Sequence, residues 1–250
     1  MLPKIIFSII IFLYGITIGS FLNVCIYRIP KKENIVTTRS HCMQCGYQLK
    51  WYDLVPLFSW LVLGGKCRKC KAKISVQYPL IEVLNGIFYL LIFACYGISI
   101  EMLLYSLLAS ALIVISVIDF RTYEIPFGIN VFIAFLGLVR VLTDWSNWLE
   151  YVVGFFSVSV VLYVIYVVTN GQGIGGGDIK LMAASGLLLG WKSNIFAFLL
   201  GCMLGSVCHV IRMRIGKANH MLALGPYLSV GIIIAALWGK EWIRWYFSLF

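Results

Sequence analysis

Charge is scarce in this chain. Only 12% of its 250 residues are charged, whereas 61% are hydrophobic. A soluble domain carries about 25% charged and about 45–50% apolar residues, and no soluble core of this length could hide so much apolar surface. The shortage of charge therefore excludes an ordinary soluble protein and places the bulk of the chain in lipid, as one helical bundle with one polar insert.

Acidic residues are the rarer of the two charged classes. The chain has ten of them against twenty lysines and arginines, which leaves a net charge of +10. In a soluble protein such an excess would indicate a nucleic-acid partner. In a membrane protein, basic residues gather on the cytoplasmic side. We therefore interpret the charge as a topology signal, and we expect membrane lipid and no nucleic acid as a partner.

The chain also lacks a low-complexity linker, a repeat of fixed period and a signal-peptide cleavage site. The uncharged run 5–27 is longer than the apolar region of about 7–15 residues in a signal peptide, and no A-x-A-like site follows it. We interpret this run as a retained first span.

Long apolar runs are abundant. A helix needs about 20 mostly apolar residues to cross a bilayer. The uncharged runs of about this size are 5–27, 83–100, 102–118, 125–139, 151–169, 181–191, 193–211 and 221–239. Of these, 181–191 is short and approaches spanning length only if it starts near Asp178. The runs predict an all-α polytopic membrane protein of about eight transmembrane helices, divided into a first helix (1–27), a zinc-binding insert (28–78) and a membrane core (79–250).

The insert sets the expected orientation. It holds ten of the twenty basic residues and only two acidic ones. The positive-inside pattern then places it in the cytoplasm. We expect a multi-pass protein of the cell inner membrane with this insert on the cytoplasmic face.

Two CxxC pairs stand in the insert, Cys42 with Cys45 and Cys67 with Cys70, separated by 21 residues. Four thiolates close a tetrahedral shell, which is typical of a structural zinc site. Four unligated thiols, or a redox pair, are the alternatives, and His41 is a possible replacement ligand. A segment of about 50 residues has too little core to fold securely alone, so metal binding would supply part of its folding free energy.

Two acidic residues lie at the ends of apolar runs. Asp119 ends the third run and Asp178 begins the sixth, both on the cytoplasmic side of the expected topology. Ionisable groups at such positions are costly and indicate function. Two neighbouring carboxyl groups can share one proton and act as acid and base toward water. The alternatives are that Asp178 caps its helix and that Asp119 pairs with Arg121.

A set of motifs covers nearly the whole chain. It comprises GSFLNV at 19–24, YRIP at 27–30, RS at 39–40, WYDLVP at 51–56, QYPLIE at 77–82, DFRTYEIP at 119–126, GGDIKL at 176–181 and LGPY at 224–227. With these motifs the chain strongly resembles the bacterial type IV prepilin peptidases, a family of leader peptidases and N-methyltransferases. Phe127 and the Met43–Gln44 pair depart from the family's usual residues.

The resemblance implies a membrane aspartic endopeptidase with Asp119 and Asp178 as its catalytic residues. Its substrates would be type IV prepilins or pseudopilins of pilus or secretion systems, cut after the glycine of the leader. Because the zinc insert is present, N-methylation of the new terminus with S-adenosylmethionine is also expected. Glu82 is a candidate near the methylation site, although it could equally pair with a lysine of the insert such as Lys71 or Lys73.

Three rival functions remain. The chain could be a peptidase without methylation, a proton-coupled transporter that uses the two aspartates as relays, or a non-enzymatic zinc-bearing scaffold. The transporter is disfavoured because both acids are expected at one face, rather than near the bilayer midplane.

Overall fold

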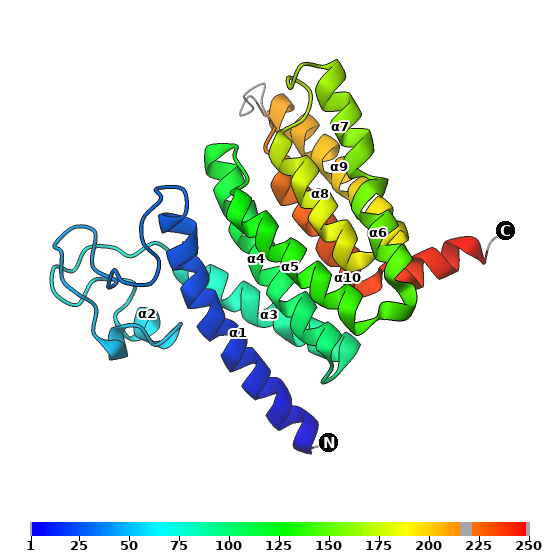
Figure 1. Cartoon of the computed structure of the whole chain (residues 1–250). Coiled ribbons are helices and arrows are strands. Elements are labelled where there is room, and N and C mark those ends of the chain that lie inside the picture. The colour runs from blue at the N-terminus through cyan, green and yellow to red at the C-terminus, as the bar shows by residue number, and fades with distance from the viewer. Residues whose placement is uncertain (1, 216–221, 249–250) are drawn as a thin grey trace. The chain divides into compact units, whose positions relative to one another are not determined.

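The computed structural model describes residues 2–215 and 222–248, and these residues form helices and loops without a β-strand. The chain divides into two compact units, Met1–Met102 and Leu103–Phe250. The helices of both are drawn in Figure 1.

The first unit is a pair of long helices joined by the insert. α1 (Leu2–Arg28) and α3 (Gln77–Tyr96) flank it, and the insert has only two short helical elements, η1 (Trp51–Asp53) and α2 (Phe58–Val62). Arg28 in the last turn of α1 suits the negative end of the helix dipole. Gly97 ends α3 with a φ of 62°, a conformation that glycine adopts without strain.

The second unit contains the remaining helices. α4 (Ile100–Thr122) begins just before the unit boundary, and the loop 123–126 ends at Pro126, which precedes α5. The later elements are α5 (Phe127–Thr143), η2 (Trp145–Asn147), α6 (Trp148–Ser157), α7 (Ser159–Val168), α8 (Gly176–Leu189), α9 (Trp191–Arg214) and α10 (Gly225–Phe247).

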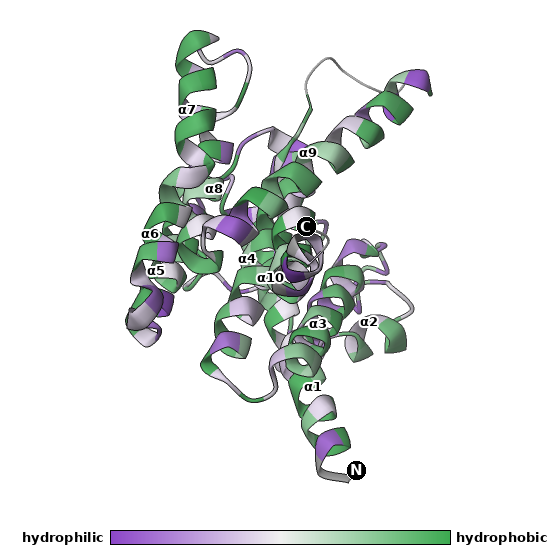
Figure 2. Ribbon diagram, turned by 90° about the vertical axis from the view of Figure 1, so that its right-hand side faces the viewer, coloured by the Kyte–Doolittle hydropathy of each residue, from purple (hydrophilic) through white to green (hydrophobic). Residues whose placement is uncertain are grey.

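Within residues 2–215 and 222–248, five helical stretches are long and apolar enough to cross a membrane: Lys4–Arg28, Gln77–Tyr96, Ile100–Thr122, Trp145–Val168 and Trp191–Arg214. Two shorter apolar helices, Phe127–Thr143 and Gly225–Gly239, accompany them. Figure 2 shows that hydrophobic residues predominate along these helices. The predicted all-α membrane architecture is confirmed. Each of the eight apolar runs corresponds to helix, although Met221, the first residue of the last run, lies outside the described residues.

One run differs from the expectation of a single continuous helix. The stretch 151–169 is divided into α6 and α7 at Val158. Ser157 and Ser159 on either side donate their hydroxyls to the carbonyls of Gly154 and Phe155. Such back-bonding by serine bends a helix, which explains a break that hydropathy alone does not indicate.

Small residues let the helices of the second unit approach closely. A Cβ on Gly186 of α8 would overlap the carbonyl oxygen of Gly154 on α6. Asn194 of α9 is fully buried beside them and donates to the carbonyls of Gly154 and Met182 at 3.2 and 3.1 Å. Close backbone approach and interhelical hydrogen bonds are the usual attractions between helices in lipid. α8 is therefore held firmly, and its N-terminus carries Asp178.

Candidate active site and metal centre

Asp119 lies in the last turn of α4 and is only 5% exposed. Its carboxyl group is held by the start of α10, where the Gly225 backbone N–H donates to Asp119 Oδ2 at 2.9 Å. A Cβ at position 225 would lie 2.7 Å from that oxygen. The glycine is therefore needed for the approach of the α10 backbone to the carboxylate.

Asp178 lies in the first turn of α8 and is 9% exposed. Its carboxylate lies against the backbone of Gly175 at the helix start, where a Cβ would come within 3.0 Å of Asp178 Oδ2. The favourable end of the helix dipole also faces it. Asp178 Oδ1 is buried and receives no hydrogen bond from the residues that the structure describes. A buried oxygen without a partner is unusual in a purely structural residue.

The structure brings the two aspartates together. They are 59 positions apart along the chain (178 − 119 = 59), but the helix ends that carry them are neighbours. Gly177, beside Asp178, packs against Ile125 so closely that a Cβ would lie 2.9 Å from it. The segment after α4 thus contacts the start of α8. The site consists of two buried carboxyl groups on neighbouring helix ends within the second unit.

The four insert cysteines also converge. Their sulfur atoms all lie within 4.8 Å of one another, with 3.8 Å between Cys42 and Cys70 and 4.0 Å between Cys45 and Cys67. Backbone N–H groups of Cys45 and Gln44 bond to the Cys42 sulfur and lower the pKa of that thiol to about 6. The cluster can hold a metal ion.

The two cysteine turns have matching hydrogen bonds. Cys42 N–H donates to the Tyr47 carbonyl at 2.9 Å, and Cys67 N–H donates to the Ala72 carbonyl at 2.8 Å. The residue after each pair has a positive φ, 67° at Gly46 and 60° at Lys71. Both turns therefore direct their two sulfurs to the same place by the same backbone fold.

Asp53 joins the two turns, a role that the sequence analysis did not foresee. Its side chain is 1% exposed and bonds to Arg68 Nε at 2.7 Å. It also accepts hydrogen bonds from the Tyr47 hydroxyl at 3.4 Å and the Lys50 N–H at 3.2 Å. The sequence signal was available, since Asp53 is one of only two acids among ten basic residues in the insert.

Glu82 of α3 is buried and 6% exposed. It accepts the backbone N–H of Leu57 at 2.8 Å and a hydrogen bond from Ser20 of α1. Among the described residues no ion pair joins it to Lys71 or Lys73. It connects the insert to both long helices of the first unit.

Two family models match the chain. The model described as Bacterial Peptidase A24 N-terminal domain matches residues 13–96, and the one described as Type IV leader peptidase family matches residues 106–210. These ranges fall in the first and second unit respectively.

Curated relatives match over nearly the whole chain, and each is named prepilin leader peptidase/N-methyltransferase. One from Bacillus subtilis (strain 168) is 32% identical over 96% of this chain and 98% of its own length. One from Pseudomonas putida is 31% identical over 91% of this chain and 89% of its own. A third, from Aeromonas salmonicida (strain A449), is 30% identical over 99% of this chain and 96% of its own length. No solved structure matches the chain.

Proposed function

The chain belongs to the type IV leader peptidase family, and we propose that it is a membrane aspartic endopeptidase that removes the leader of type IV prepilins or pseudopilins. Its catalytic residues are Asp119 and Asp178. The observation that carries this assignment is the meeting of two helix ends from distant parts of the chain, each with a buried carboxyl group, one of which has an oxygen without a partner among the described residues.

The arrangement suits hydrolysis by a carboxyl pair. Two neighbouring carboxyl groups cannot both ionise easily, so one of them keeps a proton. The ionised member takes a proton from water while the water oxygen attacks the scissile carbonyl carbon, and the protonated member donates its proton to the carbonyl oxygen. The C–N bond of this tetrahedral intermediate then breaks: the first carboxyl group gives its proton to the leaving amine nitrogen, and the second takes back a proton from the intermediate's hydroxyl as the new carboxyl group forms. The Gly225 N–H orients Asp119, and the unpartnered Oδ1 of Asp178 is free to bond to water or substrate.

The two aspartates lie at the ends of α4 and α8. A leader is cut at the corresponding place in the substrate, where its membrane helix begins. Such a substrate is expected to have a membrane helix that follows its basic leader. The end of the second unit that carries the aspartates is also rich in basic groups. Lys180 lies over the ring of Phe127 at 5.1 Å, and Arg212 lies over the ring of Phe120 at 5.6 Å. By the positive-inside rule this end is cytoplasmic, which supports an inner-membrane enzyme that cuts on the cytoplasmic side.

The four cysteines fit zinc in a structural role. Four sulfurs about 2.3 Å from one tetrahedral ion stand about 3.8 Å apart, close to the measured 3.8 and 4.0 Å pairs. A shell of four thiolates leaves no position for substrate. Zinc would therefore stabilise the insert and take no part in hydrolysis.

The proposal includes N-methylation of the new N-terminus, on the strength of the curated relatives' names. S-adenosylmethionine would supply the methyl group. Glu82 is the candidate for holding the substrate amine, because a buried carboxylate attracts an ammonium group. Its bond to the Leu57 N–H favours an anchoring role equally.

Cleavage of a prepilin in lipid by the wild-type chain, Asp119→Asn and Asp178→Asn tests the peptidase. Each variant keeps the shape of the side chain, and the amide oxygen introduced by Asp119→Asn can still accept the Gly225 N–H. We expect each to lose at least about 10³-fold in kcat/KM while thermal unfolding and zinc content stay unchanged. Glu150→Gln is the matched control, since Glu150 is exposed on α6. If either aspartate variant cleaves as fast as this control, the carboxyl-pair mechanism is wrong.

Methylation is tested separately on the same product. Mass spectrometry of the cleaved substrate with and without S-adenosylmethionine detects a gain of one methyl group at the new N-terminus. Glu82→Gln should cleave normally and methylate poorly if Glu82 holds the amine. Loss of both activities together would assign Glu82 to anchoring alone.

A further inference from the structure

The insert exposes apolar side chains around its short helix. Five residues, here called the α2 face, are Trp51 (80% exposed), Val55 (38%), Phe58 (61%), Leu61 (60%) and Val62 (81%). Soluble surfaces rarely gather such residues unless something covers them. The surrounding insert is strongly basic, so the apolar face is a feature that its composition does not explain.

The position of this segment along the membrane helices indicates what covers the α2 face. α1 and α3 pack antiparallel, and a Cβ on Gly19 would lie 2.7 Å from the Glu82 Cα. Arg28, at the polar end of α1, is nine residues further on, or about 13 Å at 1.5 Å per residue. Because a Glu82 carboxylate oxygen accepts the Leu57 N–H, the backbone at Leu57 lies within one side-chain length of Glu82, on the membrane side of Arg28.

The backbone in this segment is arranged for an apolar medium. Lipid offers no hydrogen bonds, so irregular backbone at such depth must satisfy its polar groups within the protein. Pro56 has no N–H. Leu57 N–H bonds to Glu82, while the N–H groups of Phe58 and Ser59 bond to the carbonyls of Pro56 and Val55 at 2.6 and 3.1 Å.

Leu57 also has a φ of 62° and a ψ of −55°, an unfavourable conformation for a side chain of this size. The surrounding structure must maintain it. The buried Glu82 carboxylate is the partner that holds this turn against the helix pair.

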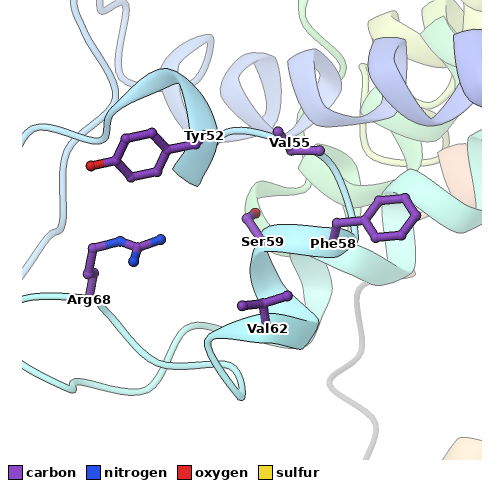
Figure 3. Close-up of a pocket in the computed structure, with 6 residues that line it drawn as sticks. All are labelled: Tyr52, Val55, Phe58, Ser59, Val62 and Arg68. Carbon is purple, nitrogen blue, oxygen red and sulfur yellow. The ribbon is translucent and has the colours of Figure 1, made fainter.

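The segment has a charged group beside its apolar side chains, since Val55, Phe58 and Val62 line one pocket with Tyr52 and Arg68. Figure 3 shows Tyr52 and Arg68 together on one side of α2, with Phe58 pointing away from both. The Arg68 guanidinium lies over the Tyr52 ring at 5.0 Å. On α3, Leu80 and Leu84 flank the position of Glu82 and are also exposed, 63% and 38%, so apolar side chains are exposed on the helix and the segment at similar depth.

We propose that residues 55–63 form a re-entrant segment that enters the lipid leaflet on the insert's side, where the acyl chains of the bilayer cover the α2 face. The exposed basic groups of the insert, Lys50, Lys66, Arg68, Lys69, Lys71 and Lys73, complement anionic headgroups. The insert is thus seated in the membrane surface, in addition to being tethered by α1 and α3.

Depth-dependent quenching tests this placement. The full-length, zinc-loaded chain is put in nanodiscs with a fluorescent amino acid at Phe58 or Leu61, in lipids whose acyl chains are brominated about 5–10 Å below the headgroups. Matched controls carry the probe at Val36 or Met43, which are exposed elsewhere in the insert (91% and 74%). Because the probes are placed by amber suppression, the zinc thiols stay untouched.

In brominated lipid, emission from the probes at Phe58 and Leu61 should fall at least about twofold more than emission from the controls. Iodide in the aqueous phase should instead quench the control probes at Val36 and Met43. Zinc content verifies that each labelled chain is folded, and Val62 replaces any position that fails this check. Equal quenching at all positions overturns the proposal. Quenching of the Phe58 and Leu61 probes by iodide, without quenching by brominated lipid, overturns it as well. If an added prepilin then removes the iodide quenching, the substrate rather than lipid covers the α2 face.

Discussion

Replacing Gly225 with alanine should damage catalysis more than folding. Gly225 donates its N–H to Asp119 Oδ2 and has no room for a side chain. The new Cβ would lie 2.7 Å from Oδ2, 3.1 Å from Cγ and 3.2 Å from Cβ of Asp119. All three neighbours belong to one short side chain on a buried helix turn, so the carboxyl group must move as a whole.

The size of the effect follows from that displacement. Ordinary contact with a Cβ begins at 3.4 Å, so Oδ2 must retreat by at least 3.4 − 2.7 = 0.7 Å. Misplacing a catalytic group by about 1 Å can cost about 10²-fold in rate. We therefore expect kcat to fall about 30- to 100-fold, or roughly 2–3 kcal/mol in activation free energy. KM should change little, because the loss concerns the transition state.

Steady-state cleavage of a prepilin in lipid measures this, with thermal unfolding followed by circular dichroism on the same samples. Gly128→Ala is the matched control, because Gly128 is also near the start of a helix and a Cβ there meets nothing within 4 Å. Should Gly225→Ala retain the activity of Gly128→Ala, the α10 backbone does not position Asp119 and the reasoning fails.

Three further perturbations concern stability. Cys67→Ser should abolish tight zinc binding and make the insert sensitive to protease, measured by metal analysis and limited proteolysis; retained zinc would contradict a four-sulfur site. Lys71→Gly should relieve about 1 kcal/mol of left-handed backbone strain and raise apparent zinc affinity about fivefold in a chelator competition, whereas unchanged affinity would show that the strain is absent in solution. Gly186→Ala should lower thermal stability by about 1–3 kcal/mol, because its Cβ meets the Gly154 carbonyl; a melting temperature equal to that of Gly128→Ala would disprove close packing of α6 on α8.

Features encoded by local sequence were the predictable ones. Apolar runs predict helices because the bilayer demands about 20 apolar residues for each span. Two CxxC pairs predict a cluster because each turn presents two sulfurs to one ion. Asp119 and Asp178 stand out because carboxyl groups are rare beside apolar runs. Residue type and spacing suffice for such features.

Features that depend on backbone contacts between distant segments were not predictable. The approach of the Gly225 N–H to Asp119 joins residues 106 positions apart, and the Leu57 bond to Glu82 joins residues 25 apart. A glycine or a leucine carries no chemical signal of either contact. The motif at 224–227 was recognised, but its contact with the carboxylate required the fold.

The catalytic assignment likewise rests partly on the sequence and partly on the structure. The resemblance predicts which residues act, and the structure supplies the burial and the proximity that such chemistry requires. The catalytic roles of Asp119 and Asp178, the zinc and methyl-donor assignments and the boundaries 1–27, 28–78 and 79–250 stay predictions.

The matching turns around Cys42 and Cys67 bear on how the protein is made. During synthesis the first cysteine pair leaves the ribosome 25 residues before the second, when α1 exists and α3 does not. Two thiolates leave half of a tetrahedral shell open. A metal ion could therefore be held by all four sulfurs only when Cys70 has emerged, seven residues ahead of Gln77, the first residue of α3. If the insert needs this ion to fold, a cell short of the metal would insert α1 and α3 around an unfolded loop, so metal supply would limit how much finished protein is made.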